Sequence, residues 1–138
     1  MSVGVIIVNY FTEDLLRPLV KSLVGFPMIR EMIVFDNGSN PLLDLGEGKA
    51  RVMRQGHNIG FAAAVNRAFS SISSDYVLLL NPDLRIDAAA VERLLAASRR
   101  YQCPMVGPRF DWDDAHLFRL PPATGALRWL TVGADAPS

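Results

Sequence analysis

The chain has 138 residues, of which 50% are hydrophobic and 20% are charged, and its formal net charge is zero at pH 7. This composition is typical of one globular domain with a substantial core, and it excludes a disordered chain. The balanced charge gives no general attraction for nucleic acid or for anionic membranes, so we expect no nucleic-acid partner.

The cysteine content and the hydropathy pattern predict the cellular compartment of the protein. The single cysteine, Cys103, cannot form a disulfide within the chain, which favours a reducing environment. Met1 and Ser2 lead directly into an apolar run, without the basic segment that begins a signal peptide. No apolar stretch approaches the roughly 20 residues of a membrane span. We therefore expect a cytoplasmic protein, either free in solution or peripheral to the inner face of the membrane.

The first half of the sequence alternates apolar runs with helical patterns. Val3–Val8 is almost continuously apolar and predicts a strand that is covered on both faces. Thr12 is expected to cap a helix that ends near Gly25, although Pro18 must then lie in its first turns or kink it. Two more strands are predicted, a buried one at Met32–Phe35 and a short edge strand at Arg51–Met53.

The second half repeats this alternation. A helix is predicted from Gly60, and the apolar run Tyr76–Leu80 predicts a buried strand. Asp87 is expected to cap a further helix, and Met105–Val106 predicts a short strand before an irregular tail. Strands that alternate with helices predict an α/β fold with a mostly parallel sheet and right-handed crossovers.

Polar segments follow three of the predicted strands. They are Asn9-Tyr10, Asp36-Asn37-Gly38-Ser39 and Asn81-Pro82-Asp83. Because ligands bind beyond the carboxyl ends of parallel strands, we expect these segments to meet at one edge and to bind a nucleotide there. Asp83 would be a carboxylate at the place where a hard cation and a phosphate meet.

The glycine-rich loops of two common nucleotide-binding folds are absent. A dinucleotide-binding fold has Gly-x-Gly-x-x-Gly after its first strand, where this chain has Asn9-Tyr10-Phe11-Thr12. The phosphate loop Gly-x-x-x-x-Gly-Lys-Ser/Thr is also missing from the sequence. The sequence therefore supports neither NAD chemistry nor P-loop ATP chemistry.

Four motifs together resemble a known family. They are Val8-Asn9-Tyr10, Asp36-Asn37-Gly38-Ser39, Asn58-Ile59-Gly60-Phe61-Ala62 with Asn66, and Leu80-Asn81-Pro82-Asp83. Their order and spacing resemble glycosyltransferase family 2, most closely its rhamnosyltransferase-type branch, over roughly the first 110 residues. Ala68 departs from the glycine that is common at that position. The resemblance implies the GT-A fold, a Rossmann-like three-layer sandwich with a mostly parallel sheet, here truncated.

The resemblance also implies roles for the motif residues. The first three motifs would hold the nucleotide of a UDP- or dTDP-sugar donor. This assigns donor contacts to Asn9, Tyr10, Asp36, Asn37, Gly38, Asn58, Gly60 and Asn66. The last motif, with Asn81 and Asp83, is the version of Asp-x-Asp found in this branch. Asp83 would bind Mg²⁺ or Mn²⁺ that bridges the diphosphate of the donor.

Each assignment has a simpler alternative. The Asp36 carboxylate suits the ring N–H of a pyrimidine, but an aspartate before Asn37-Gly38 also begins a turn. The small residues after Asn58 let a sugar nucleotide approach the backbone, or they permit close packing of a helix. The Asp83 carboxylate suits a metal, or it caps backbone groups at the end of the strand.

The tail is expected to differ from the rest of the chain. We divide the sequence into a donor-binding domain, residues 1–110, and an irregular tail or start of a missing acceptor half, residues 111–138. Asp111, Asp113, Asp114 and His116 match no metal-ligand spacing and predict a solvated loop. The large apolar residues of the tail predict packing against another subunit or a missing domain. They are Trp112, Phe118, Leu127, Trp129 and Leu130.

Two functions from different classes follow. The chain is the donor half of an inverting glycosyltransferase, which transfers a sugar to a hydroxyl of a sugar, lipid or polysaccharide acceptor. Alternatively, it is a catalytically incomplete module that binds sugar nucleotides or protein partners. The resemblance places the general base on a later segment, so no residue of this sequence is assigned a catalytic role.

Overall fold

The structure is a computed structural model that describes residues 1–39, 43–45 and 48–108. The chain forms two compact units, Met1–Arg85 and the segment from Ile86 onward. Each unit is described separately below. The predicted boundary at residue 110 and the predicted contacts of the tail lie outside the described residues.

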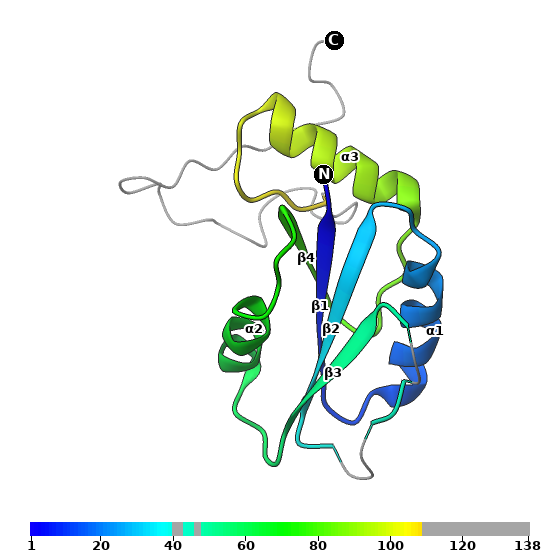
Figure 1. Ribbon diagram of the computed structural model, residues 1–138, viewed down its shortest axis with the longest axis vertical. Helices are drawn as coiled ribbons and strands as arrows, with labels where there is room; N and C mark the ends of the chain where they lie inside the picture. Colours follow the sequence, from blue (N-terminus) through cyan, green and yellow to red (C-terminus); the bar gives the residue numbers. More distant parts are fainter. Residues whose placement is uncertain (40–42, 46–47, 109–138) are drawn as a thin grey trace, which may run out of the picture. The chain divides into compact units, whose positions relative to one another are not determined.

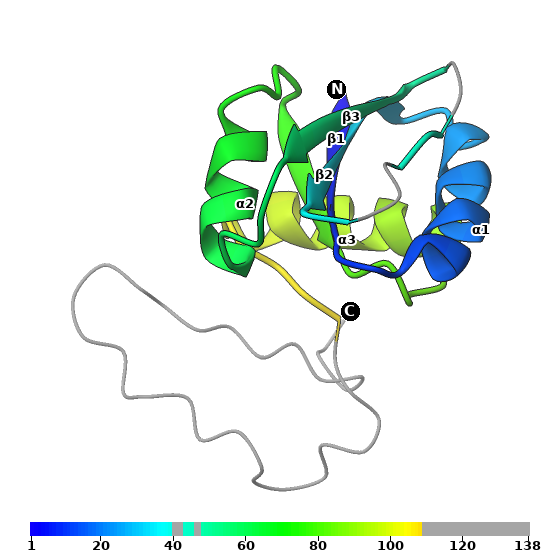
Figure 2. The same ribbon diagram turned by 90° about the horizontal axis from the view of Figure 1, so that it is seen from below.

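The first unit contains a four-stranded parallel sheet and two helices (Figure 1). The strands are β1 (Val3–Asn9), β2 (Ile29–Asn37), β3 (Ala50–Gln55) and β4 (Tyr76–Leu80), in the spatial order β3-β2-β1-β4. The helices are α1 (Glu13–Val24) and α2 (Phe61–Phe69). Figures 1 and 2 show α1 and α2 on opposite sides of the sheet. The predicted α/β architecture with three layers is confirmed.

The two central strands are buried on both faces. Alternate residues of β1 and β2, including Ile6 and Phe35, pack with Ala64 and Ala68 of α2. The residues between them point to the opposite face of the sheet and are buried as well. They are Val5, Ile7, Met32 and Val34. Burial on both faces explains why these strands are almost continuously apolar instead of alternating.

The burial of β4 differs from the prediction. In the described sheet β4 bonds only to β1, so it is an edge strand and not a central one. Leu80 is its one buried residue, and Leu79 is 45% exposed. The prediction that Tyr76–Leu80 is a buried strand is therefore wrong for four of its five residues. An apolar run indicates a strand, but it does not specify the number of neighbours that the strand has.

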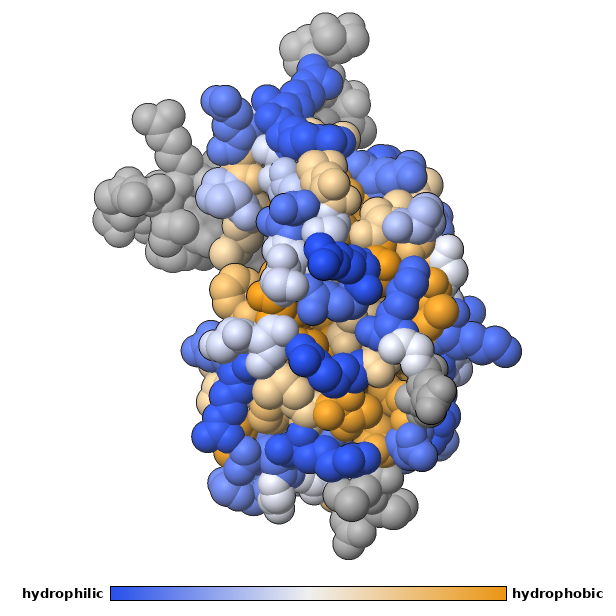
Figure 3. Space-filling model, in the orientation of Figure 1, coloured by the Kyte–Doolittle hydropathy of each residue, from blue (hydrophilic) through white to orange (hydrophobic). Residues whose placement is uncertain are grey.

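The opposite edge carries charge. Arg51 and Arg54 are exposed on β3, as is common on edge strands. Their guanidinium groups donate to the backbone carbonyls of Ser71 and Leu43, at 2.8 and 2.6 Å. Figure 3 shows strongly hydrophilic residues mixed with apolar ones on this side of the molecule.

Helix α1 begins and ends as predicted, but its start is stabilised differently. Thr12 is the N-cap residue, yet its side chain makes no capping hydrogen bond to the helix. The Thr12 hydroxyl donates instead to Asn9 Oδ1, at 2.8 Å. Pro18 lies inside the helix, where the proline ring removes the hydrogen bond to the carbonyl of Asp14.

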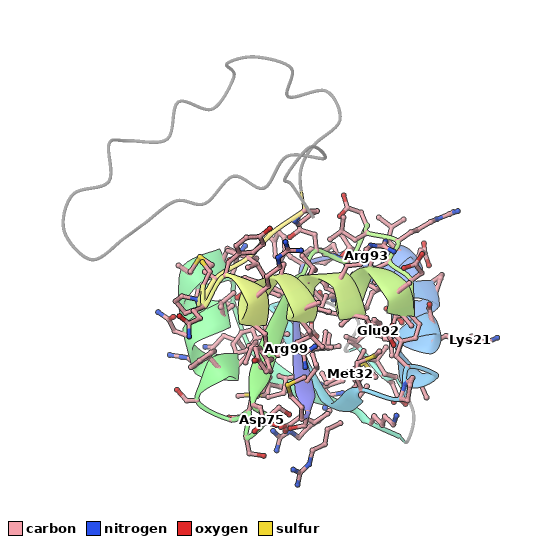
Figure 4. The ribbon with its side chains drawn as sticks, turned by 90° about the horizontal axis from the view of Figure 1, so that it is seen from above. Lys21, Met32, Asp75, Glu92, Arg93 and Arg99 are labelled. Carbon is pink, nitrogen blue, oxygen red and sulfur yellow. The ribbon has the colours of Figure 1, made fainter. Side chains whose placement is uncertain are left out.

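Hydrogen bonds at the amino edge of the sheet attach the loop before β4. Glu31 Oε1 accepts from the Ser74 hydroxyl at 2.8 Å, and from the backbone N–H and hydroxyl of Ser73 at 2.9 and 3.2 Å. These donors, Ser74 first, hold the pKa of Glu31 below its ordinary value. Asp75 directly precedes β4 (Figure 4) and accepts from the Ser2 backbone N–H at 2.7 Å. That bond is the main cause that lowers the pKa of Asp75.

The second unit contains helix α3 (Ala88–Arg100), on which Val91 and Leu95 are buried. Asp87 caps α3 as predicted, because Asp87 Oδ1 accepts from the Ala90 backbone N–H. Glu92, Arg93 and Arg99 project from this helix (Figure 4). The predicted strand at Met105–Val106 is absent: these residues have no regular structure and Met105 is 75% exposed.

Within the described residues, no helix is both long enough and apolar enough to cross a membrane.

Candidate functional site

The three predicted polar segments emerge at one edge of the sheet. Asn9 is level with Asp36 across β1 and β2, and Ile7 is level with Leu80 across β1 and β4. All strands are parallel, so their carboxyl ends lie together. Two strand spacings separate β2 from β4, about 10 Å. Asp36 and the Asp83 segment therefore flank the end of β1.

Asn9 is the centre of a buried hydrogen-bond network at this edge. Its side chain is fully buried, and its Nδ2 donates to Asp36 Oδ1 and to Ser39 Oγ, each at 3.1 Å. Asn9 Oδ1 accepts from the Thr12 backbone N–H at 3.3 Å and from the Thr12 hydroxyl. Asp36 is 2% exposed. This network fixes the Asp36 carboxylate relative to the first turn of α1.

A second network joins the end of β2 to the loop before α2. Asn37 Nδ2 donates to Asn58 Oδ1 at 2.9 Å, and Asn37 Oδ1 accepts from the Ile59 backbone N–H at 3.0 Å. Asn58 Oδ1 also accepts from the Gly60 backbone N–H, at 2.8 Å. The amide groups of Asn37 and Asn58 thus hold this loop against the sheet.

Gly38 lies between these two networks and must be glycine. Its φ is +95°, a conformation that glycine adopts without strain. A Cβ atom at this position would lie 2.9 Å from the Asn58 backbone nitrogen and 2.9 Å from the His57 carbonyl carbon. Gly38 therefore permits the close approach of the two segments.

Two exposed aromatic side chains follow β1 at this edge. Tyr10 is 48% exposed and Phe11 is 59% exposed, and their rings pack edge to face with centroids 4.7 Å apart. Phe11 has a φ of +55°, which is rare for a bulky residue. Its backbone N–H donates to Ser39 Oγ at 3.1 Å, which stabilises this conformation. Such strain is commonly found at functional sites.

The remaining predicted site residues are exposed. Gly60 precedes α2 with a φ of +84°, and a Cβ atom there would meet nothing within 4 Å. Asn66 is exposed on α2. Asn81 and Asp83 are exposed after β4, where the Leu84 N–H donates to the Asn81 carbonyl at 3.3 Å. No hydrogen bond or ion pair between described residues involves the Asp83 carboxylate.

The described residues do not form a metal cage by themselves. Among them, no group of three or more histidine, cysteine, aspartate or glutamate side chains is placed to hold an ion. The edge instead offers one buried carboxylate, Asp36, and one exposed carboxylate, Asp83, with aromatic side chains beside them. This arrangement can accept hydrogen bonds at one end and contribute a single metal ligand at the other.

Three residues of this edge were missed as individual site residues. The sequence motif that contains Ser39 predicts no separate role for it, and the pattern around Thr12 predicts only helix capping. Phe11 gave no sequence signal, because its unusual backbone conformation depends on the hydrogen bond to Ser39. The asparagines were predicted as donor contacts, but nothing predicted that they bond to one another.

Comparisons with known proteins relate this chain to a protein family and to a solved structure. The family model described as Glycosyl transferase family 2 matches residues 4–134. A search of curated proteins finds no match. Among solved structures, the chain is similar to residues 1–349 of TarS from S. aureus, with a TM-score of 0.60 and 20% sequence identity. The likeness covers 74% of this chain and 33% of the TarS chain, and it concerns the GT-A, Rossmann-like fold.

Proposed function

This chain belongs to glycosyltransferase family 2, and we propose that its carboxyl edge binds a UDP- or dTDP-sugar together with Mg²⁺ or Mn²⁺. The bound donor would then transfer its sugar to an acceptor hydroxyl with inversion. The observation that supports the proposal is that Asp36 lies at the end of β2 and the Asp83 segment follows β4, the two strands that pair with β1 on either side.

The base of the nucleotide is proposed to bind at Asp36. A uracil or thymine ring has an N–H that a carboxylate can accept, and Asp36 is held in place by Asn9. A buried and oriented acceptor discriminates strongly, because a ligand without the matching donor leaves it unpaired. Tyr10 follows Asn9, is exposed, and offers an aromatic ring on which the base can pack.

The diphosphate and the metal are proposed to bind towards Asp83. A single exposed carboxylate is a poor metal site alone, but it fits Mg²⁺ that keeps several waters and takes its other ligands from phosphate oxygens. The donor set at this edge therefore fits an ion that binds jointly with the nucleotide. Bound there, the ion would neutralise the charge that develops on the departing diphosphate.

The residues after Asn58 are proposed to approach the sugar and phosphates. Asn58 and Asn37 fix the loop, and Gly60 presents backbone without a side chain at a position that is open to solvent. An open backbone segment at the start of a helix can bind anionic oxygens through its N–H groups. The Asn66 side chain, exposed on the same helix, is retained as a proposed donor contact.

The acceptor remains a sugar, lipid or polysaccharide hydroxyl in this proposal. We assign no described residue as the general base that would remove its proton. The cytoplasmic location is part of the same proposal, because the lone Cys103 suits a reducing compartment. The rhamnosyltransferase-like branch remains a prediction from the motifs.

The role of Asp83 can be tested with the change Asp83→Asn. We expect the affinity for UDP to fall by about tenfold or more when Mn²⁺ is present, because the amide is a much weaker metal ligand. Without metal, the affinity of the variant and of the unchanged chain should be equal. Isothermal titration with UDP, with and without Mn²⁺, measures both quantities.

The change Glu92→Gln is a matched control, since it removes an exposed carboxylate from α3. It should leave UDP binding unchanged in both conditions. If Asp83→Asn binds UDP and Mn²⁺ as tightly as the unchanged chain, Asp83 is not the metal ligand.

The alternative function is a binding module without turnover. The two functions separate in one assay, in which the chain is incubated with radiolabelled UDP- or dTDP-sugars, Mn²⁺ and candidate acceptors. Transfer or metal-dependent hydrolysis of the donor supports an enzyme. Tight donor binding without either reaction supports the binding module.

A further inference from the structure

The orientation of the Asn9 amide determines the hydrogen-bonding character of its neighbours. The Thr12 backbone N–H can only donate, and it points at one end of the amide, which must therefore be the oxygen Oδ1. The other end, Nδ2, then donates its two hydrogens to Asp36 Oδ1 and to Ser39 Oγ. Because the Thr12 backbone N–H fixes the position of Oδ1, the opposite orientation of the Asn9 amide, with oxygen and nitrogen exchanged, is excluded.

Ser39 Oγ is consequently an acceptor for two obligatory donors. It receives one hydrogen from Asn9 Nδ2 and another from the Phe11 backbone N–H, each at 3.1 Å. A hydroxyl oxygen has two lone pairs, so both are occupied and the hydroxyl hydrogen is left to donate. In the part of the chain that the structure describes, the Ser39 hydroxyl donates no hydrogen bond. Ser39 is partly exposed, so this donor is available to a ligand.

Asp36 presents the complementary group beside it. No hydrogen bond between described residues uses Asp36 Oδ2. Every completely enclosed side-chain oxygen or nitrogen in the described ranges has a hydrogen-bond partner, so Oδ2, which has none, keeps some contact with solvent although Asp36 as a whole is 2% exposed. A single nitrogen, Asn9 Nδ2, thus links an acceptor on Asp36 to a donor on Ser39.

We propose that Asp36 and Ser39 together read the imide edge of a uracil or thymine base and reject cytosine. This inference rests on the proposed function and adds a specificity-determining residue, Ser39. Uracil and thymine have a ring N–H with a carbonyl oxygen on each side. The N–H donates to Asp36, and the neighbouring C4 carbonyl accepts from the Ser39 hydroxyl; cytosine carries an amino group, a donor, in place of that carbonyl. Cytosine has an unprotonated ring nitrogen in place of the N–H, which sets a second acceptor against the Asp36 carboxylate.

The inference is tested by the ratio of two dissociation constants, that of CDP divided by that of UDP. Both are measured on the full chain with Mn²⁺ by isothermal titration, and dTDP serves as a second imide-bearing ligand. The unchanged chain should bind UDP and dTDP similarly and CDP more weakly. Ser39→Ala should lower the ratio by about tenfold, since it removes the hydrogen bond to the C4 carbonyl, which cytosine does not have.

The change Ser39→Thr keeps the hydroxyl and should restore most of the ratio. Ser70→Ala is the matched control, because the Ser70 hydroxyl donates to the Asn66 carbonyl at the end of α2. It should leave the ratio unchanged. Thermal unfolding of each variant defines a temperature at which all of them are folded for the titrations.

The outcomes separate this inference from the proposed function. If Ser39→Ala weakens UDP and CDP equally, Ser39 only supports Asn9 and Phe11, and the base reading by its hydroxyl is overturned while donor binding stands. Equal affinity of the unchanged chain for UDP and CDP overturns the inference in the same way. If the unchanged chain binds no nucleotide with Mn²⁺, the proposed function fails and this inference fails with it.

Discussion

At the scale of single residues, the polar groups of the carboxyl edge are of two kinds. Some are bonded to neighbouring residues and hold them in position, and others keep an atom available to a ligand. Asn9 and Asn37 use both amide atoms in bonds to neighbouring residues, and Asn58 uses its amide oxygen. Asp36 and Ser39 keep a surface atom available. The predicted donor contacts of the three asparagines remain predictions, but their internal bonds suit residues that position others. Preorganised polar groups of this kind bind a ligand without first reordering.

Gly38 gives the sharpest prediction at this scale. Gly38→Ala should lower the free energy of unfolding by about 2–4 kcal/mol, because the new Cβ meets backbone atoms of His57 and Asn58 and the φ of +95° is strained. Urea unfolding followed by circular dichroism measures the change. The loss should also weaken UDP binding, since the loop can no longer approach β2.

Two other glycines serve as controls for Gly38→Ala. Gly56→Ala meets nothing within 4 Å and has no positive φ, so it should be neutral or slightly stabilising. Gly60→Ala is equally open but has a φ of +84°, so it should cost about 1 kcal/mol. Equal effects of all three changes would contradict the contact argument for Gly38.

At the scale of elements, the two edges of the sheet have different tasks. The carboxyl edge gathers the proposed site, whereas the amino edge attaches β4 to β2 through the loop that contains Ser73 and Ser74. One carboxylate, Glu31, accepts all three hydrogen bonds of this attachment. Because β4 bears the Asp83 turn at its other end, its anchoring also fixes the proposed metal ligand.

The lowered pKa of Glu31 predicts a pH dependence of stability. The folded-state pKa lies below the ordinary value of 4.5, so the ionised group stabilises the fold above that value. This contribution is lost as the pH falls through the lowered folded-state pKa. Glu31→Gln should therefore be less stable than the unchanged chain at neutral pH, and the difference should shrink well below 4.5. Urea unfolding at several pH values measures it, and a constant difference would contradict the assignment.

Much of the element order could be predicted, because apolar runs and turn residues are local signals. Tyr76–Leu80 forms a strand with the predicted bounds, and Asp87 caps α3. The edge position of β4 could not be predicted, since it depends on strand order, which no local pattern encodes. Thr12 is at the predicted cap position, yet its hydroxyl bonds to Asn9 because a partner from β1 competes with the helix.

The site was predictable to the level of segments and not of contacts. Parallel strands bring their carboxyl ends together, so the convergence of Asn9, Asp36 and Asp83 follows from the α/β pattern. The bonds that Asn9 makes to residues 27 and 30 positions away depend on strand register and on the path of the following loops. Register is a property of the packed sheet, so sequence motifs alone do not give it.

At the scale of the whole molecule, ligand binding should stabilise the fold, because the proposed site connects β1, β2 and β4. A ligand that binds only the folded chain adds about 2.7 kcal/mol when it is present at about 100 times its dissociation constant. UDP with Mn²⁺ should therefore raise the unfolding temperature, and CDP with Mn²⁺ should raise it less at the same concentration. Calorimetry of the full chain measures both shifts.

A matched experiment with Mn²⁺ alone completes this prediction. Since the described carboxylates form no cage for an ion, the metal by itself should shift the unfolding temperature little. A large shift with Mn²⁺ alone would contradict joint binding of metal and nucleotide, and would place an ion elsewhere in the protein.

The bonds of Asn37 have a further consequence for the chemical durability of the chain. An asparagine followed by glycine is the dipeptide most prone to deamidation, because the glycine nitrogen attacks the side-chain amide carbon to form a cyclic imide. In the folded chain both amide atoms of Asn37 are hydrogen-bonded and the side chain is 3% exposed, so this ring cannot close easily. Deamidation of Asn37 would thus occur in unfolded molecules. The aspartate that it produces would carry a negative charge that hinders the refolding of these molecules.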